Sequence, residues 1–236
     1  MTSILHIETA TSVCSVALAK DGQHVSFREI NRGNAHAEKV TIFISEVMQE
    51  AGISFSELSA VAVSSGPGSY TGLRIGISTA KGICFGKDLP LISIPTLYAM
   101  AAGAKQHLRA QSISAGDRSI LFCPMIDARR MEVYCALYDE NLSERRGVMA
   151  QEISGETFDD YLNHHQLIFS GDGCAKFESL FSGNKNIVFL PDVLCSSRFM
   201  VELAFLKFSE KQFENLSLFE PFYLKEFVPG RGSRPI

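Results

Sequence analysis

The stretch IETATSVCSVAL at residues 7–18 recurs as IDARRMEVYCAL at residues 126–137, and this pair decides the fold. The two copies have the same length, begin with isoleucine and a carboxylate, and end with Ala-Leu. Each reads as an apolar strand, a turn and a second strand. Short strands can match in this way by chance, so the elements around the two copies must also agree. We interpret the pair as the opening of two related halves.

The elements on either side of the two copies follow the same order. After the first copy, Asp21-Gly22 between alternating runs predicts a hairpin to a third strand. Further expected elements of this half are a helix near 37–51, a strand at 60–65, a helix after the glycine-rich run, a strand at 89–94 and a helix at 96–111. The second half repeats this with three strands within 122–150, a helix near 156–164, a strand at 166–171, a short helix, a strand at 186–190 and a long helix near 196–213.

Two βββαβα units with a carboxylate at the end of each first strand predict an α/β protein of the actin-like (ribonuclease H-like, ASKHA) fold. In that architecture paired hairpins face each other across two subdomains. We expect an N-terminal subdomain at 1–111, a linker at 112–119, a C-terminal subdomain at 120–228 and a loose Gly/Pro/Arg-rich tail at 229–236.

Composition excludes several functional classes. The 236 residues are 46% hydrophobic and 20% charged, with a net charge of -4, so no global basic field draws the chain onto nucleic acid. The start lacks a signal-peptide pattern, and no apolar run is long enough for a membrane span. Six scattered cysteines with no C-x-x-C pair favour buried, reduced thiols. We expect a cytoplasmic protein that does not contact the membrane.

Five segments together resemble one family. ILHIETATSVCSVAL, NAHAE, SSGPGSYTGLRIGISTAKG, DARRMEVYCALY and PFYLKEFV occur in the order seen in the bacterial TsaB (YeaZ) family of tRNA threonylcarbamoyladenosine biosynthesis proteins. The resemblance implies an actin-like fold and a non-catalytic scaffold that binds the transferase TsaD, together with the ATPase TsaE. It further implies a homodimer when the protein is alone, contact with tRNA only through the complex, no tightly bound cofactor, and ATP within the complex.

The glycine-rich run at 64–82 has two interpretations. A glycine loop between a strand and a helix can bind an anion through backbone N–H groups. The run lacks the spacing of a dinucleotide or Walker loop and is not G-x-S-x-G, so we favour a turn in which Ser69 or Thr71 caps the helix. The residues of this motif are Ser65, Gly66, Pro67, Gly68, Ser69, Tyr70, Thr71 and Arg74, with His36 and Glu38 from NAHAE.

The helix after this run predicts an interface. Leu73, Ile77, Ala80 and Cys84 fall on one face, which we expect to be the core face. Glycine costs a helix about 1 kcal/mol relative to alanine, so glycines on the opposite face need a compensating close approach, by a partner or by the other half of this chain. The resemblance favours a partner. The expected interface comprises Ile42, Glu46, Gln49, Gly72, Ile75, Thr79, Gly82, Ile83 and Gly86.

Metal and nucleotide sites look incomplete. His36 is followed at i+4 by Val40, so the paired histidines of a helical metal site are missing, and His36 with Glu38 more simply orients the helix start. Glu8 stands where active actin-like enzymes usually have Asp. Weak nucleotide binding remains an expectation for Glu8, Thr9, Asp127, Gly171 and Gly173, beside the alternative that the carboxylates cap turns. We expect no catalytic residue; the alternatives are an independent ATPase or phosphotransferase and, less favoured, a metallopeptidase.

Overall fold

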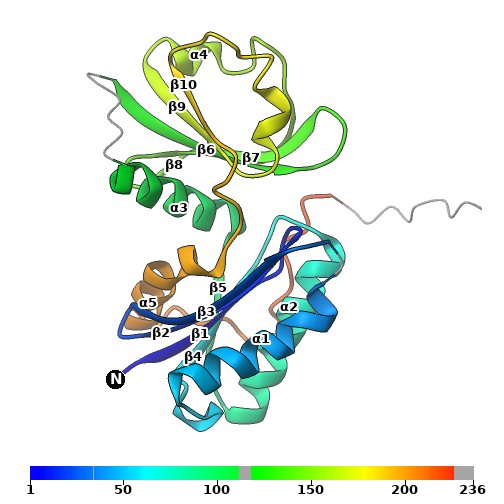
Figure 1. Cartoon of the computed structure of the whole chain (residues 1–236), viewed down its shortest axis with the longest axis vertical. Helices are drawn as coiled ribbons and strands as arrows, with labels where there is room; N and C mark the ends of the chain where they lie inside the picture. The colour runs from blue at the N-terminus through cyan, green and yellow to red at the C-terminus, as the bar shows by residue number, and fades with distance from the viewer. Residues whose placement is uncertain (34, 112–117, 226–236) are drawn as a thin grey trace, which may run out of the picture.

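The computed structural model describes residues 1–33, 35–111 and 118–225. Most of the expected linker, the expected tail and Asn34 lie outside the described residues. Within them, two five-stranded mixed sheets form two units, one above the other in Figure 1. The first sheet contains β1 (Ser3–Glu8), β2 (Val13–Lys20), β3 (Gln23–Asn31), β4 (Ala60–Ser64) and β5 (Leu91–Ile94). The second contains β6 (Ser119–Asp127), β7 (Glu132–Asp139), β8 (Glu144–Glu152), β9 (His165–Ser170) and β10 (Ile187–Leu190).

The two sheets have the same topology. Their strand orders are β3-β2-β1-β4-β5 and β8-β7-β6-β9-β10. In each, the first strand pairs antiparallel with the second and parallel with the fourth. The predicted α/β actin-like fold and its duplication are therefore confirmed.

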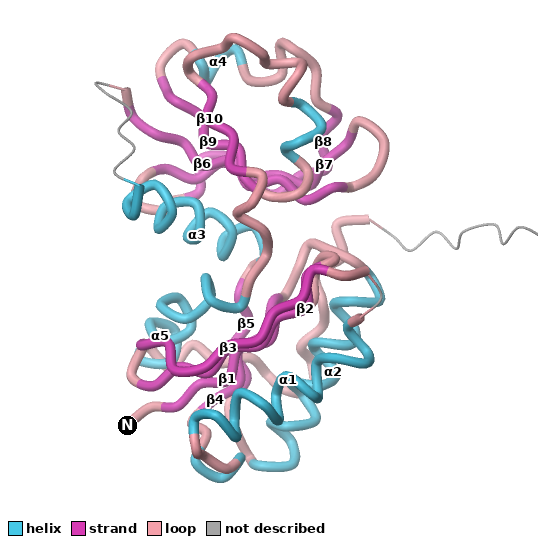
Figure 2. Tube along the Cα trace, viewed as in Figure 1, coloured by secondary structure: helices cyan, strands magenta, loops and turns pink. Residues whose placement is uncertain are grey.

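Helices cover both faces of each sheet (Figure 2). The apolar stripes of α1 (His36–Ala51) and α2 (Tyr70–Lys87) pack on one face of the first sheet, where the two helices lie side by side. The opposite face carries the short 3-10 helix η3 (Ser197–Met200) and α5 (Val201–Ser209). The second sheet is covered by α3 (Thr96–Gln111) on one face and by α4 (Asp159–Leu162) with η2 (Cys174–Phe177) on the other. A further short 3-10 helix, η1 (Phe55–Glu57), precedes β4.

The last helix of each unit crosses to the other unit. α3 follows β5 along the chain but packs against β6, and α5 follows β10 but packs against β5 (Figure 1). The aromatic ring of Phe199 closes one such crossing, because a Cβ added at Gly103 of α3 would lie 2.5 Å from this ring. The exchange joins the two units tightly.

Two predicted helices are shorter than expected. The helix expected near 196–213 is η3 followed by α5, which ends at Ser209 because Lys211 has a left-handed backbone with φ 57°. The helix expected near 156–164 is reduced to the four residues of α4. The residues at 214–225, beyond α5, contain a turn at 216–218 but no helix or strand, and we call them the C-terminal strap.

The strap runs along α2 and reaches the second unit. The backbone N–H of Phe222 donates to the carbonyl oxygen of Ser65 at 2.7 Å. Lys81 of α2 donates from Nζ to the carbonyl oxygen of Phe219 at 3.1 Å. At its end, Lys225 forms an ion pair with Glu132 at the start of β7. The strap therefore links both units.

Two expectations from composition can be compared with the structure. All six cysteines are free and buried, as predicted. No helix among the described residues has both the length and the hydropathy that a membrane span requires.

Candidate functional site

The glycine-rich run holds the β1–β2 turn against α2. Ser69 caps α2, because its Oγ accepts a hydrogen bond from the N–H of Gly72 at 3.3 Å. The N–H of Ser69 donates to the carbonyl oxygen of Ala10 at 2.6 Å, and Thr9 Oγ1 donates to the carbonyl oxygen of Gly72 at 2.8 Å. The turn of the chain itself thus occupies the helix start, where an anion would otherwise bind.

Three glycines permit this close approach. A Cβ at Gly68 would lie 2.3 Å from the carbonyl oxygen of Ala10, and a Cβ at Gly72 would lie 2.1 Å from that of Thr9. A Cβ at Gly76 would lie 2.2 Å from Thr9 Oγ1. Our placement of Gly72 on the outward face of α2 was therefore wrong, since this residue is buried against the β1–β2 turn.

Glu8 lies at the end of β1 and is fully buried. One carboxyl oxygen, Oε1, accepts a hydrogen bond from the N–H of Ala10 at 2.6 Å, whereas Oε2 has no hydrogen-bond partner among the described residues. Burial raises the pKa of Glu8 to about 7, although the Ala10 N–H acts in the opposite direction. Glu8 therefore lies inside the protein, with one carboxyl oxygen held by the backbone of the β1–β2 turn.

In the second unit, a lysine side chain binds the corresponding turn between β6 and β7. Lys176 of η2 donates from Nζ to Asp127 Oδ1 at 2.8 Å, and to the carbonyl oxygens of Arg130 and Glu132 at 2.8 and 2.9 Å. Asp127 Oδ1 also accepts from the N–H of Arg129 at 2.6 Å. Partial burial would raise the pKa of Asp127, but the Lys176 ammonium and the Arg129 N–H lower it below its usual value. The carboxylate of Asp127 thus caps its own turn.

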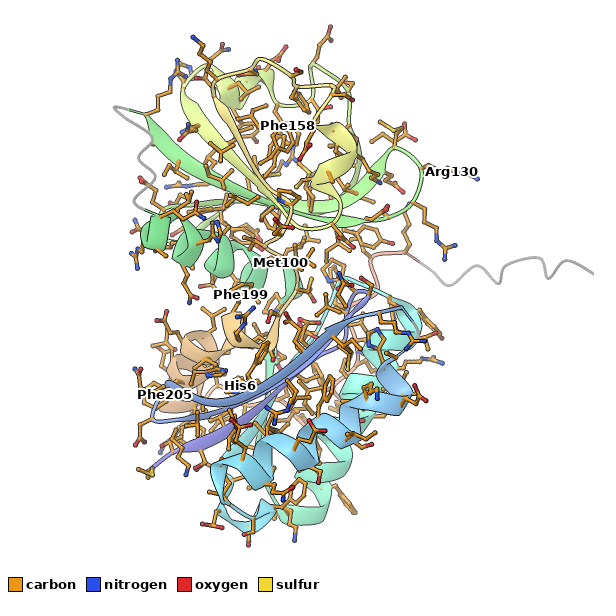
Figure 3. The ribbon with its side chains drawn as sticks, in the orientation of Figure 1. His6, Met100, Arg130, Phe158, Phe199 and Phe205 are labelled. Carbon is orange, nitrogen blue, oxygen red and sulfur yellow. The ribbon has the colours of Figure 1, made fainter. Side chains whose placement is uncertain are left out.

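Gly171 and Gly173 pack tightly within the protein. A Cβ at Gly171, which has φ 96°, would lie 2.2 Å from Met100 Cε and 2.4 Å from the carbonyl oxygen of Met125. A Cβ at Gly173 would lie 2.9 Å from Val133. These glycines therefore permit the contact of their turn with α3 and β6; Figure 3 labels Met100 at the junction of the two units.

His36 anchors the start of α1. Its Nε2 lies 2.7 Å from the carbonyl oxygen of Thr11, so it joins the helix to the β1–β2 turn. Glu38 is an exposed acid in the first helical turn. Within residues 1–33, 35–111 and 118–225, no group of three or more His, Cys, Asp or Glu side chains is placed to hold a metal ion.

The outward surface of the helix pair α1 and α2 is open at Ile42 of α1 and near the C-terminal end of α2. Nothing lies within 4 Å of a Cβ added at Gly82 or Gly86, and Ile42 of α1 is 45% exposed. The Phe85 side chain between the two glycines is 84% exposed, and our sequence analysis missed it, although its place between Gly82 and Gly86 on the helix was a usable signal. We call Ile42, Gly82, Phe85 and Gly86 the open helix face.

The other expected interface residues border this face. Ile75 and Ile83 are half-buried against the core, and Thr79 donates from Oγ1 to the carbonyl oxygen of Ile75 at 2.8 Å. Gln49 is exposed. Glu46 instead pairs with Arg28 of β3 at 2.7 Å, so its charge is directed toward the sheet edge.

Aromatic contacts fasten the strap beside the motif loop. The rings of Tyr70 and Tyr223 have centroids 4.8 Å apart. The guanidinium of Arg74 lies 4.1 Å from the Tyr70 ring centroid and donates from Nε to the Tyr223 hydroxyl at 3.3 Å. These contacts connect the SSGPGSYTGLRIGISTAKG and PFYLKEFV segments, which are 149 residues apart at Arg74 and Tyr223.

Two cavities lie outside these turns. One of about 410 Å³ is bordered by both units and the strap, and includes Tyr98, Tyr138 and Phe222. Another of about 490 Å³ lies in the second unit beside Ser119 and His165. Neither Glu8 nor Asp127 lines either cavity.

Comparison with known proteins gives consistent matches. The family model of TsaD, the tRNA N6-adenosine threonylcarbamoyltransferase, matches residues 31–226. The chain is 32% identical to the tRNA threonylcarbamoyladenosine biosynthesis protein TsaB of Escherichia coli, over 95% of each chain. It is 30% identical to TsaB of Haemophilus influenzae, over 97% of this chain and 98% of the relative. The structure of YeaZ from Pseudomonas aeruginosa superposes with a TM-score of 0.74 at 23% identity, over 95% of this chain and 100% of that one, and supports the fold.

The duplicated topology, with its two hairpin turns at the ends of β1 and β6, defines an α/β protein of the actin-like class. The family match covers more than half of the chain, and the relatives match over nearly its full length. The chain belongs to the TsaB (YeaZ) family, which acts in the threonylcarbamoyladenosine modification of tRNA.

Proposed function

We propose that this chain is a non-catalytic scaffold subunit that binds a TsaD-type transferase in tRNA threonylcarbamoyladenosine biosynthesis. The open helix face carries this proposal: it presents an 84% exposed Phe85 between two glycines that have free space above them. Exposed aromatic side chains beside small residues are common in protein interfaces, because a partner helix can approach closely. In the isolated state, the same face joins two copies in a homodimer.

The turns support the absence of catalysis. The Lys176 ammonium binds the β6–β7 turn, the β1–β2 turn covers the start of α2, and Glu8 is fully buried. We expect no tightly bound cofactor, and ATP to enter through the complex with its TsaE-type ATPase. Contact with tRNA occurs in the assembled cytoplasmic complex, without a membrane.

The test is the mass in solution of the chain mixed with the TsaD-type protein of the same organism. We expect a heterodimer that Gly82→Arg abolishes without unfolding. Gly155→Arg is the matched control, because Gly155 is an exposed glycine of the second unit whose added Cβ would meet only Leu180 at 4.0 Å. A heterodimer that tolerates Gly82→Arg contradicts the proposed surface, and steady ATP turnover by the lone chain favours the independent ATPase.

A further inference from the structure

The β6–β7 turn has an unusual backbone conformation at two adjacent arginines. Arg129 and Arg130 both have left-handed backbones, with φ 70° and 53°. Glycine or asparagine adopts this conformation at lower cost, so the turn itself does not explain arginine at either position. A strained backbone that persists indicates a role for the side chains it displays.

Side-chain and backbone hydrogen bonds hold this turn in place. The Lys176 ammonium donates to three oxygens of the turn, and Ala128 N–H donates to the carbonyl oxygen of Glu132 at 3.2 Å. Lys176 is a half-buried side chain with 22% exposure. The two arginines are therefore presented on a fixed support.

Both arginine side chains are free for a ligand. They are exposed, and among the described residues neither forms an ion pair within 4.0 Å. The two neighbouring carboxylates already have partners, since Asp127 binds Lys176 and Glu132 binds Lys225. Figure 3 shows Arg130 at the outer tip of the second unit, directed away from the protein. In a chain of net charge -4, this tip is locally basic.

We propose that Arg129 and Arg130 bind the phosphodiester backbone of the tRNA substrate in the assembled complex. Guanidinium groups bind phosphate oxygens in a bidentate manner, and such contacts position RNA without reading its sequence. A projecting turn suits a polymer backbone, whereas a small nucleotide needs a concave pocket, and neither cavity described above includes these arginines. This inference rests on the proposed function and assigns a direct RNA contact to this subunit.

The test compares the wild-type heterodimer with the variant Arg129→Gln/Arg130→Gln. Thermal unfolding and mass in solution establish that the variant folds and assembles. Binding of an unmodified tRNA transcript is then measured by fluorescence anisotropy at several salt concentrations. We expect about ten-fold weaker binding, and a slope of log K against log salt that is shallower by roughly 1.5, because two phosphate contacts are lost. Arg145→Gln is the control, since Arg145 is an exposed arginine of the same unit that pairs with Asp139.

The outcomes separate this inference from the proposed function. Failure of the wild-type chains to form a heterodimer refutes the proposed function, and this inference with it. A normal heterodimer whose tRNA affinity and salt slope are unchanged in the variant refutes the RNA contact alone. Loss of the heterodimer in the variant assigns the arginines to a protein contact and also overturns the proposal.

Discussion

Lys176 Nζ lies 2.8 Å from Asp127 Oδ1 and joins η2 to the turn that follows β6. The same ammonium donates to the carbonyl oxygens of Arg130 and Glu132, so its removal takes one hydrogen bond from each of three acceptors of this turn. We expect Lys176→Met to lower the free energy of unfolding by about 2 kcal/mol, the usual scale for hydrogen bonds to a charged group. Urea unfolding measures this change. Lys185→Met at an exposed position of the second unit is the control, and an equal loss there contradicts a specific role for Lys176.

Gly72 and Gly82 lie on the same helix and should respond oppositely to alanine. At Gly72 the new Cβ would meet the carbonyl oxygen of Thr9 at 2.1 Å, so Gly72→Ala should destabilise the protein by about 3 kcal/mol. At Gly82 nothing lies within 4 Å, so Gly82→Ala should stabilise it by about 1 kcal/mol through helix propensity. Thermal unfolding of the two variants checks both signs. A destabilising Gly82→Ala is inconsistent with an open position.

Titration of Glu8 should make the free energy of unfolding depend on pH between 4.5, its ordinary pKa, and about 7, its pKa in the folded protein. Its folded pKa of about 7 lies above the ordinary 4.5, so the stability from its neutral form is complete below pH 4.5 and is lost as the pH rises through 7. Each pKa unit corresponds to about 1.4 kcal/mol. We expect Glu8→Gln, which keeps an acceptor for the Ala10 N–H, to be more stable than wild type at pH 8.5 by a few kcal/mol. If the difference between the two proteins is the same at pH 5 and pH 8.5, Glu8 does not titrate as described.

His6 gives the opposite dependence on the acidic side. Burial lowers the pKa of His6 from 6.5 to about 4, while its Nδ1 lies 3.3 Å from the carbonyl oxygen of Ala17. The stability from neutral His6 is present above pH 6.5 and is lost as the pH falls toward 4. Denaturant titrations at pH 7 and pH 4.5 should show a smaller acid loss for His6→Gln than for wild type. A parallel decline in both proteins would rule out His6 as the titrating group.

The duplicated topology could be predicted because it follows from hydrophobic patterns among residues that are close in sequence. The alternation around residues 7–18 and 126–137 and the helical stripe at Leu73, Ile77 and Cys84 depend on neighbours in sequence. The core side of α2 followed directly from this stripe. The length of α5 did not, because its end is set by the left-handed backbone at Lys211.

The contacts of the candidate site were harder to predict from the sequence, because they join residues that are far apart along the chain. A helical wheel places Gly72 on the outward side, yet the β1–β2 turn folds over the start of α2 and covers it. Lys176 could not be linked to Asp127 by any spacing rule, since 49 residues separate them and η2 brings them together. The signal at Arg129 and Arg130 is a backbone conformation, which residue identity alone does not show.

Because α3 and α5 each pack on the sheet of the other unit, neither half of the chain contains all the residues of its own hydrophobic core. A fragment that ends at residue 111 keeps α3 but loses the helix that shields Ile4, Ile92 and Ile94, while the remainder loses the helix that shields Phe122 and Ile168. The two units thus depend on each other to cover their apolar sheet faces. A cut between the two units therefore exposes an apolar sheet face on each side, so that the repeated units must fold and unfold together.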